Sequence, residues 1–149
     1  KVKVLTRKPR TETLFLDFFD GQTVNFEITS TTDQEEFFKD VDFLSINTPK
    51  SDGYIIDAAQ FEMMKDGIFI VNTARGGVLN EVTLLQFIES GKIAGAALDV
   101  FENEPTPELP LLMNPNLSLS PHLGGNTVDA QEKIGAELAA QIIDIKNKL

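Results

Sequence analysis

The sequence predicts an α/β fold built on a doubly wound parallel sheet. Two observations lead to this fold class. Short runs rich in β-branched and aromatic residues alternate along the 149-residue chain with segments that carry helix start and stop signals. Several of these runs are apolar on both faces, as expected for strands that helices cover on both sides. The repeated alternation favours a parallel sheet with right-handed crossovers.

Six segments are expected to be strands because they are short, apolar and bounded by turn residues. They cover residues 1–6, 23–29, 42–47, 67–73, 93–100 and 116–120. The segment LFLDFF, residues 14–19, is ambiguous. Pro105, Pro107 and Pro110 break residues 101–112 into a loop before the last strand.

Four segments are expected to be helices. They are residues 32–40, 57–67 and 81–90, and a last helix that starts near Thr127. Gly67 is expected to close the second helix. Asn80 can cap the third with its side chain, and Gly91 can take the left-handed position at its end. The last helix carries one apolar stripe, formed by Val128, Ile134, Leu138, Ile142 and Ile145.

The composition argues against several classes of function. With 42% hydrophobic and 24% charged residues the chain is of ordinary globular type, and neither a membrane-length apolar run nor a secretory signal is present. We expect a soluble protein without a membrane partner. Zero cysteines and one histidine argue against disulfide, thiolate and metal chemistry, and fit a cytoplasmic location. The net charge of −10 argues against nucleic acid as a partner.

The basic residues are unevenly distributed. Five of the thirteen lie within the first ten positions: Lys1, Lys3, Arg7, Lys8 and Arg10. This cluster could bind an anion. The first residue is not methionine, so we expect a fragment or a processed chain.

Candidate site residues follow the predicted strands, because ligands of such sheets bind beyond the carboxyl ends of the strands. These positions are Thr6 to Arg10, Thr48 and Pro49, Thr73 to Gly76, Asp99 to Glu104, and His122 to Gly125. They include His122, the single histidine, which is either structural or catalytic. Arg75 either pairs with a surface carboxylate or holds a ligand carboxylate through two charge-assisted hydrogen bonds. Gly76 and Gly77 favour the second interpretation, because they let a ligand come close.

The acidic residues of the turn after the fifth strand also have two interpretations. Glu102 and Glu104 are solvated loop charges unless one of them lies against His122. In that position a carboxylate stabilises the imidazolium, so that the ring can give and take a proton near neutral pH. Asp99 either caps the following turn or accepts a hydrogen bond from a ligand amide.

Three blocks of the sequence carry a family resemblance. They are VNTARGGVLNE (71–81), SGKIAGAALDVFENEP (90–105) and SPHLGGNT (120–127). In order and spacing they resemble the D-isomer-specific 2-hydroxyacid dehydrogenases, most closely the phosphoglycerate dehydrogenase branch. The likeness runs from about Asp42 to about Leu138, and residues 1–41 match more weakly.

The resemblance implies a Rossmann-like domain of an NAD-dependent oxidoreductase, with 3-phosphoglycerate as the substrate. Its catalytic residues would be Arg75, Glu104 and His122. Arg75 would hold the carboxylate and carbonyl of an anionic 2-hydroxy acid, His122 would move the proton, and Glu104 would orient His122. Cofactor contacts are implied for Thr48, Pro49, Thr73, Ala74, Asp99, His122, Gly124 and Gly125. A homodimer is the implied assembly.

Two features depart from the family pattern. The glycine-rich phosphate loop, G-x-G-x-x-G, is absent from the sequence. We therefore expect residues 1–149 to be part of a nucleotide-binding domain that lacks its first strand and this loop, without the substrate domain, and the chain alone to be inactive. The second departure is TRKPR, where Lys8 takes the place of an acidic residue that binds the ribose. Arg7, Lys8 and Arg10 could meet the 2′-phosphate of NADP, although a solvated basic turn explains them equally well.

Other functions fit parts of this pattern. The basic turn is similar to that of NADP-dependent glyoxylate and hydroxypyruvate reductases of the same family. Some members of the family are dinucleotide-sensing corepressors that keep the three catalytic residues, and a peptide-binding cleft in another domain would distinguish them. A flavodoxin-like receiver shares only the α/β layering, and the three ordered blocks argue against it.

Overall fold

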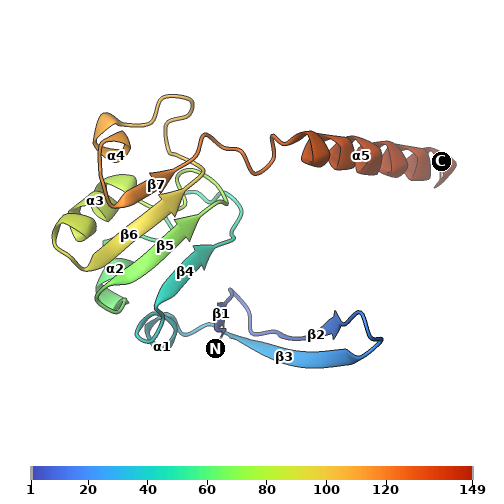
Figure 1. Cartoon of the computed structure of the whole chain (residues 1–149), viewed down its shortest axis with the longest axis horizontal. Coiled ribbons are helices and arrows are strands. Elements are labelled where there is room, and N and C mark those ends of the chain that lie inside the picture. Colours follow the sequence, from blue (N-terminus) through green and yellow to red (C-terminus); the bar gives the residue numbers. More distant parts are fainter. Residues whose placement is uncertain (1, 149) are drawn as a thin grey trace.

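A four-stranded parallel sheet forms the centre of the computed structural model, which describes residues 2–148 (Figure 1). Its strands lie side by side in the order β4 (Phe43–Ile46), β5 (Ile68–Asn72), β6 (Ile93–Leu98) and β7 (Leu117–Leu119). All neighbouring pairs are parallel. Each strand lies within a segment that the sequence predicts to be a strand, and the α/β class with a parallel sheet is confirmed.

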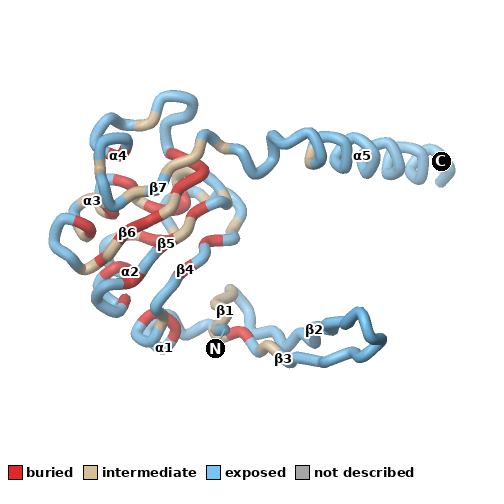
Figure 2. Tube along the Cα trace, viewed as in Figure 1, coloured by how far each residue is buried: buried red, intermediate tan, exposed pale blue. Residues whose placement is uncertain are grey.

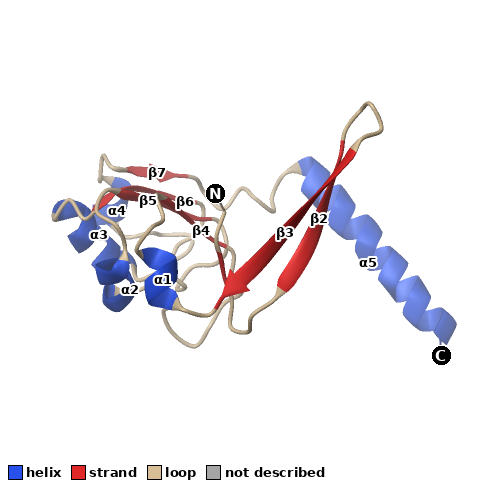
Figure 3. Ribbon diagram, turned by 90° about the horizontal axis from the view of Figure 1, so that it is seen from below, coloured by secondary structure: helices blue, strands red, loops and turns tan. Residues whose placement is uncertain are grey.

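Three helices lie on one face of this sheet (Figure 3). They are α1 (Gln34–Phe38), α2 (Ala58–Met63) and α3 (Glu81–Glu89). The core fills the space between, and Figure 2 shows most of the buried residues in this part of the chain. Its fully buried side chains include Phe38, Phe61, Ile68, Ile70, Leu79, Leu84, Ile93, Leu98 and Leu111. Because side chains alternate along a strand, Leu44 points to the helices while Phe43 points to the other face.

That other face carries no helix among residues 2–148. Phe43 and Phe69 stack on it, with ring centroids 5.7 Å apart, and both remain exposed. The expectation of helices on both faces is therefore met on one face of the part that the structure describes.

The ends of α3 follow the prediction. The Asn80 side chain accepts a hydrogen bond from the Thr83 N–H, which has no partner inside the helix. Gly91 follows the last turn with a φ of +79°, a left-handed conformation that costs glycine little because it has no Cβ.

Two local predictions were wrong. Gly67 does not close α2, because this helix ends at Met63 and Gly67 lies in the turn before β5, where its N–H donates to the Lys92 carbonyl. The proline-rich segment is not entirely a loop, because it contains the short helix α4 (Leu109–Leu112). Pro110 is tolerated there because the first helical turn needs no hydrogen-bonded N–H.

The N-terminal region forms a second sheet, of three strands in the order β1-β3-β2. β2 (Thr11–Asp17) and β3 (Thr23–Thr31) are an antiparallel hairpin, so the ambiguous segment begins as a strand. Only the end of β3 joins the expected parallel pattern, through β1 (Val4–Leu5), the part of the first predicted strand that forms. The strand expected at 23–29 therefore lies mainly in a projecting hairpin, because β2 pairs with its whole length.

The last helix, α5 (Val128–Lys148), begins where the sequence predicts. The Thr127 hydroxyl accepts a hydrogen bond from the Ala130 N–H and so caps it. The helix runs away from the central sheet in Figure 1, and its apolar stripe is exposed along its length. Within residues 2–148 no helix combines the length and the apolarity needed to span a bilayer.

Candidate active site

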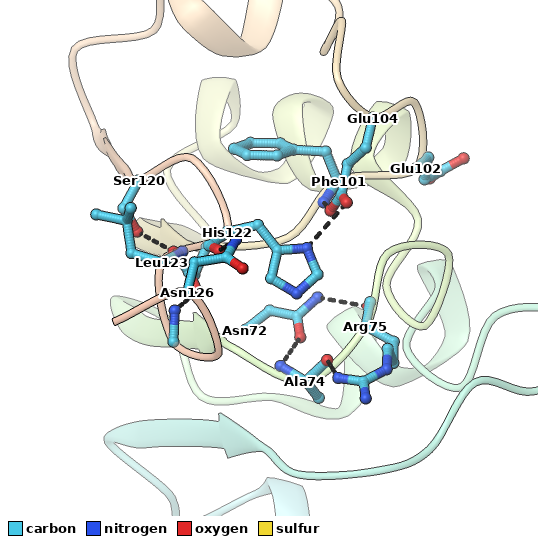
Figure 4. Close-up of polar contacts among 12 residues, drawn as sticks. Asn72, Ala74, Arg75, Phe101, Glu102, Glu104, Ser120, His122, Leu123 and Asn126 are labelled. Atoms are coloured by element: carbon cyan, nitrogen blue, oxygen red, sulfur yellow. Dashed lines mark hydrogen bonds and ion pairs between the residues drawn. The ribbon is translucent and has the colours of Figure 1, made fainter. Parts of the chain in front are cut away.

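Most of the predicted site residues gather at the carboxyl edge of the central sheet. The loops after β5, β6 and β7 meet there, and Figure 4 shows them around the His122 ring. Arg75 comes from the first loop, Glu104 from the second and His122 from the third. The parallel arrangement brings together residues that are far apart along the chain, because all these strands end at one edge.

His122 and Glu104 are directly hydrogen-bonded. The His122 Nδ1 lies 2.9 Å from Glu104 Oε2, and Glu104 Oε1 accepts from the Phe101 N–H at 2.9 Å. The hydrogen bond with His122 is the main cause that lowers the pKa of Glu104, and the Phe101 N–H adds to it. Both side chains are partly exposed. The pair leaves the second ring nitrogen of His122 on the side of Ala74 and Arg75 (Figure 4).

Asp99 holds the loop that carries His122. It is buried, and its carboxylate accepts hydrogen bonds from the Ser120 hydroxyl and from the N–H groups of Leu123 and Gly124. Burial raises the pKa of Asp99, but these hydrogen bonds outweigh burial and leave the pKa below its ordinary value. These contacts are to the loop after β7 and not to the turn that directly follows Asp99, so the predicted cap of that turn is not what the structure shows. A hydrogen bond from a ligand amide stays a prediction.

The backbone of His122 is itself unusual. Its φ is +53°, in the left-handed region that residues other than glycine seldom adopt. The Asn126 side chain donates to the His122 carbonyl at 2.8 Å, and the His122 N–H donates to the Ser120 carbonyl. Strained residues persist only where their surroundings hold them, and such residues cluster at functional sites. No sequence pattern pointed to this conformation.

Asn72 shapes the turn that carries Arg75. This buried side chain at the end of β5 accepts from the Ala74 N–H at 3.1 Å and donates to the Arg75 carbonyl at 3.2 Å. The Arg75 guanidinium donates to the Ala74 carbonyl, and no carboxylate among residues 2–148 forms an ion pair with it. The predicted surface ion pair is therefore not observed among these residues, and the ligand-binding role of Arg75 stays a prediction.

Gly76 serves a different purpose from the predicted one. A Cβ at this position would lie 1.8 Å from the Phe101 carbonyl oxygen. The glycine therefore lets the Arg75 loop pack against the loop that carries Glu104, and the close approach is to protein backbone. Gly77 has a φ of +76°, so the turn uses its conformational freedom.

Glu102 belongs to a separate carboxylate pair with Glu81, the first residue of α3. Each side chain accepts a hydrogen bond from the other's backbone N–H, at 2.7 Å from Glu102 N and 2.9 Å from Glu81 N. Tyr54 donates to the second Glu102 oxygen at 2.8 Å. Burial raises the pKa of Glu81 to about 7, assisted by the charges of Glu102, Glu104 and Glu108 and opposed by the Glu102 N–H. Glu102 is thus an exposed loop residue whose carboxylate is hydrogen-bonded, and His122 pairs with Glu104 instead. No sequence signal pointed to the Glu81–Glu102 pair.

The predicted cofactor residues after β4 and β5 lie around the same edge. Thr48, after β4, has a buried hydroxyl with no hydrogen-bond partner among the described residues, and exposed Pro49 follows it. Thr73 and Ala74 begin the turn after β5. Because a buried hydroxyl without a partner is costly, Thr48 fits a position that a bound ligand completes.

The basic turn lies after β1, on the other sheet. Its backbone is held by the Thr6 hydroxyl, which donates to the Lys8 carbonyl at 2.7 Å, and by the Arg10 N–H, which donates to the Ser30 hydroxyl at 2.8 Å. The side chains of Arg7, Lys8 and Arg10 are exposed. The structure does not pair β1 with β4, so this turn and Thr48 belong to different sheets.

These features define a class of protein. A parallel α/β sheet with loops that meet at its carboxyl edge is typical of nucleotide-binding domains, and here that edge carries a histidine–carboxylate pair beside an arginine. The chain belongs to the D-isomer specific 2-hydroxyacid dehydrogenases, because residues 5–124 match the model of the NAD binding domain of that family. NAD is the cofactor that the description of this family domain names.

Similar proteins agree on the family and differ in substrate. The chain is 44% identical over 115 residues to a hydroxypyruvate reductase of Thermotoga maritima and 40% identical over 111 residues to a D-3-phosphoglycerate dehydrogenase of Archaeoglobus fulgidus. These matches cover 74% and 72% of this chain, but 38% and 21% of the two relatives. A D-lactate dehydrogenase of Aquifex aeolicus, in complex with NAD and lactic acid, is similar with a TM-score of 0.67 and 25% identity over 81% of this chain and 41% of that one. The chain therefore spans less than half the length of these relatives.

Proposed function

We propose that the enzyme containing this chain transfers a hydride between NAD and a D-2-hydroxy acid or its 2-oxo acid, with 3-phosphoglycerate as the substrate. The observation that carries this proposal is the Glu104–His122 hydrogen bond beside an Arg75 guanidinium that no described carboxylate neutralises. An anionic hydroxy acid needs a cation to bind its carboxylate and a base to take its hydroxyl proton.

Each residue then has one chemical role. Arg75 binds the substrate carboxylate and polarises the neighbouring carbonyl. His122 takes the hydroxyl proton on the ring nitrogen that Glu104 leaves open, and returns it in the reverse direction. Glu104 accepts the Nδ1 hydrogen bond, fixes the ring orientation and stabilises the imidazolium. Bound NAD supplies the hydride acceptor for oxidation.

Cofactor contacts are proposed for the residues that follow β4, β5 and β7. The unpartnered Thr48 hydroxyl supports a contact there, with Pro49 beside it. Thr73 and Ala74 face the nicotinamide, and the backbone of Gly124 and Gly125 lies against cofactor and substrate. Asp99 already accepts three hydrogen bonds, so an added carboxamide contact would be a fourth on that carboxylate.

We also propose that residues 1–149 are the later part of the cofactor domain. In the doubly wound order 3-2-1-4-5-6, strand 1 lies between strands 2 and 4. The observed orders β3-β1 and β4-β5-β6-β7 are consistent with one missing strand between β1 and β4. The glycine-rich loop that follows such a strand, and a substrate domain, would come from other parts of the enzyme.

Three finer parts of the proposal concern the form of the dinucleotide, the assembly and the location of the enzyme. The exposed basic turn of Arg7, Lys8 and Arg10 supports a second candidate, an NADP-dependent glyoxylate or hydroxypyruvate reductase, because these side chains suit a 2′-phosphate. A homodimer in the cytoplasm completes the proposal. The exposed apolar stripe of α5 supports an assembly that covers it.

The test is the His122→Gln substitution in the full-length enzyme. Glutamine cannot exchange a proton, so we expect kcat to fall by about 100-fold or more while the dissociation constant for NADH, measured by fluorescence titration, stays unchanged. 3-Phosphoglycerate, hydroxypyruvate and glyoxylate should each be tested with NAD(H) and NADP(H), which separates the two candidates. Retention of most of the turnover by the variant would contradict the proposed role of His122.

A further inference from the structure

We infer that Glu81 and Glu102 form a clasp that positions Glu104, and through it the His122 ring. The clasp consists of the two side chains and the backbone N–H groups that they bind. Both are positioning residues, because neither contacts His122 in the structure. The inference rests on the proposed function of the Glu104–His122 pair.

The clasp ties the loop after β6 to the start of α3. Its two hydrogen bonds run in opposite directions, so each residue's backbone is held by the other residue's side chain. Tyr54 holds the Glu102 carboxylate from the other side. A reciprocal pair of this kind leaves the loop little freedom to slide along the helix, because any shift lengthens both bonds.

The position of the clasp connects it to the catalytic pair. Glu102 directly follows Phe101, whose N–H binds Glu104 Oε1, while Glu104 Oε2 binds the His122 ring. The Phe101 carbonyl lies against Gly76, so the same peptide segment is confined on a second side. The Glu104 carboxylate is therefore aimed by a backbone that Glu81 and Glu102 hold in place.

Burying the Glu81 carboxylate near other carboxylates lowers the stability of the fold, so stability does not explain why a glutamate occupies this position. Glu81 is 6% exposed and has no cationic partner among residues 2–148, and the carboxylates of Glu102, Glu104 and Glu108 raise its energy when it is ionised. The positive end of α3 offsets part of this cost. An apolar residue would suit burial better but could not bind the Glu102 N–H, which is the contact that fixes the loop.

The clasp can be tested without turnover, because His122 is the only histidine of the chain and its ring nitrogens give unambiguous NMR signals. At about pH 9, above the ordinary imidazole range, the ¹⁵N shifts report which ring nitrogen carries the proton. In the native protein we expect the proton on Nδ1, where Glu104 accepts it. Glu81→Ala and Glu102→Ala should lower the ratio of the Nδ1–H to the Nε2–H form by roughly five-fold, the effect of one ordinary hydrogen bond.

Three further variants complete the experiment. Glu81→Gln keeps an oxygen for the Glu102 N–H and should restore the native signals, which distinguishes positioning from a charge effect. Tyr54→Phe removes one contact from an exposed ring and should shift the ratio in the same direction by less. Glu89→Ala, an exposed glutamate near the end of α3, is the matched control and should change nothing.

Each outcome decides the inference. Native ring signals in folded Glu81→Ala or Glu102→Ala would overturn it. If those two variants fail to fold, Tyr54→Phe and Glu81→Gln decide: an unchanged ratio with Tyr54→Phe, or a changed one with Glu81→Gln, would also overturn it. The kinetic test of His122→Gln is a separate experiment. If that variant keeps its turnover, the proposed function is refuted, while the ring signals of proteins that retain His122 still report on the clasp.

Discussion

The central sheet and the β2–β3 hairpin are both rich in apolar side chains, but only the helix-covered face of the sheet buries them. Phe61 and Leu84 are 0% exposed between the sheet and its helices, whereas Leu16 and Phe26 on the hairpin are each 50% exposed (Figure 2). The hairpin has one apolar face, because cross-strand pairs place Leu14 opposite Phe26 and Leu16 opposite Val24. An apolar pattern thus predicts a face that can be buried, and the packing partner decides whether it is.

The loops of Arg75, Glu104 and His122 are carried by the central sheet and not by the hairpin. These three loops follow β5, β6 and β7, whose inward side chains pack into the core. A rigid sheet is a suitable support for a hydrogen-bonded pair that must keep its geometry. The hairpin and α5 contribute none of the contacts of the Glu104–His122 pair. The central sheet therefore positions the candidate site, whereas the hairpin and α5 leave their apolar side chains exposed.

The largest expected loss of stability comes from a substitution in the core. Phe61→Ala removes a fully buried ring that packs against Phe87, with centroids 5.1 Å apart. We expect the free energy of unfolding to fall by about 3–5 kcal/mol, because the cavity between α2 and α3 cannot collapse fully. Urea unfolding followed by circular dichroism measures it. A loss below about 1 kcal/mol would show that this region is not packed as the structure has it.

A smaller effect, on the order of 1–3 kcal/mol, is expected from pH. The folded pKa of Glu81 is raised to about 7 from an ordinary value near 4.5, so between these values the folded state binds more protons than the unfolded state. Its contribution to stability is therefore lost as pH rises from about 4.5 to about 7. Asp99 and Glu104, whose pKa values are lowered, act in the opposite sense: their contribution to stability is present above the ordinary carboxyl range and is lost as the pH falls below it.

The Glu81 contribution is isolated by comparison with Glu81→Gln. Glutamine keeps an acceptor oxygen but does not ionise, so the difference in unfolding free energy between the two proteins should change with pH over that range. The variant should gain on the native protein between about pH 5 and pH 8, measured by urea unfolding at each pH. A difference independent of pH would mean that Glu81 does not titrate in this range.

The sequence predicted more of the central sheet than of the hairpin for a physical reason. Turn and cap signals such as Asn80 and Gly91 act locally, so they can be found without knowing the fold. The rule that ligands bind at the ends of parallel strands predicted that Arg75 and His122 lie in the same region, but it could not predict how far apart they are. The Glu81–Glu102 bonds and the Asn72 contacts could not be found in this way, because they depend on where two backbones meet.

The smallest expected effect tests the hairpin. Phe26→Ala should lower the free energy of unfolding of this chain by less than about 1 kcal/mol, because half of the ring already contacts water and its removal opens no cavity. Thr13→Ala, on the polar face of the same hairpin, is the matched control. A loss comparable to that of Phe61→Ala would mean that the apolar face is packed in solution, and sedimentation at several concentrations would show whether a second copy covers it. If both substitutions change the free energy of unfolding by a similarly small amount, the apolar face of the hairpin adds little to the stability of this chain. Most of the stabilising burial then lies between the parallel sheet and its helices.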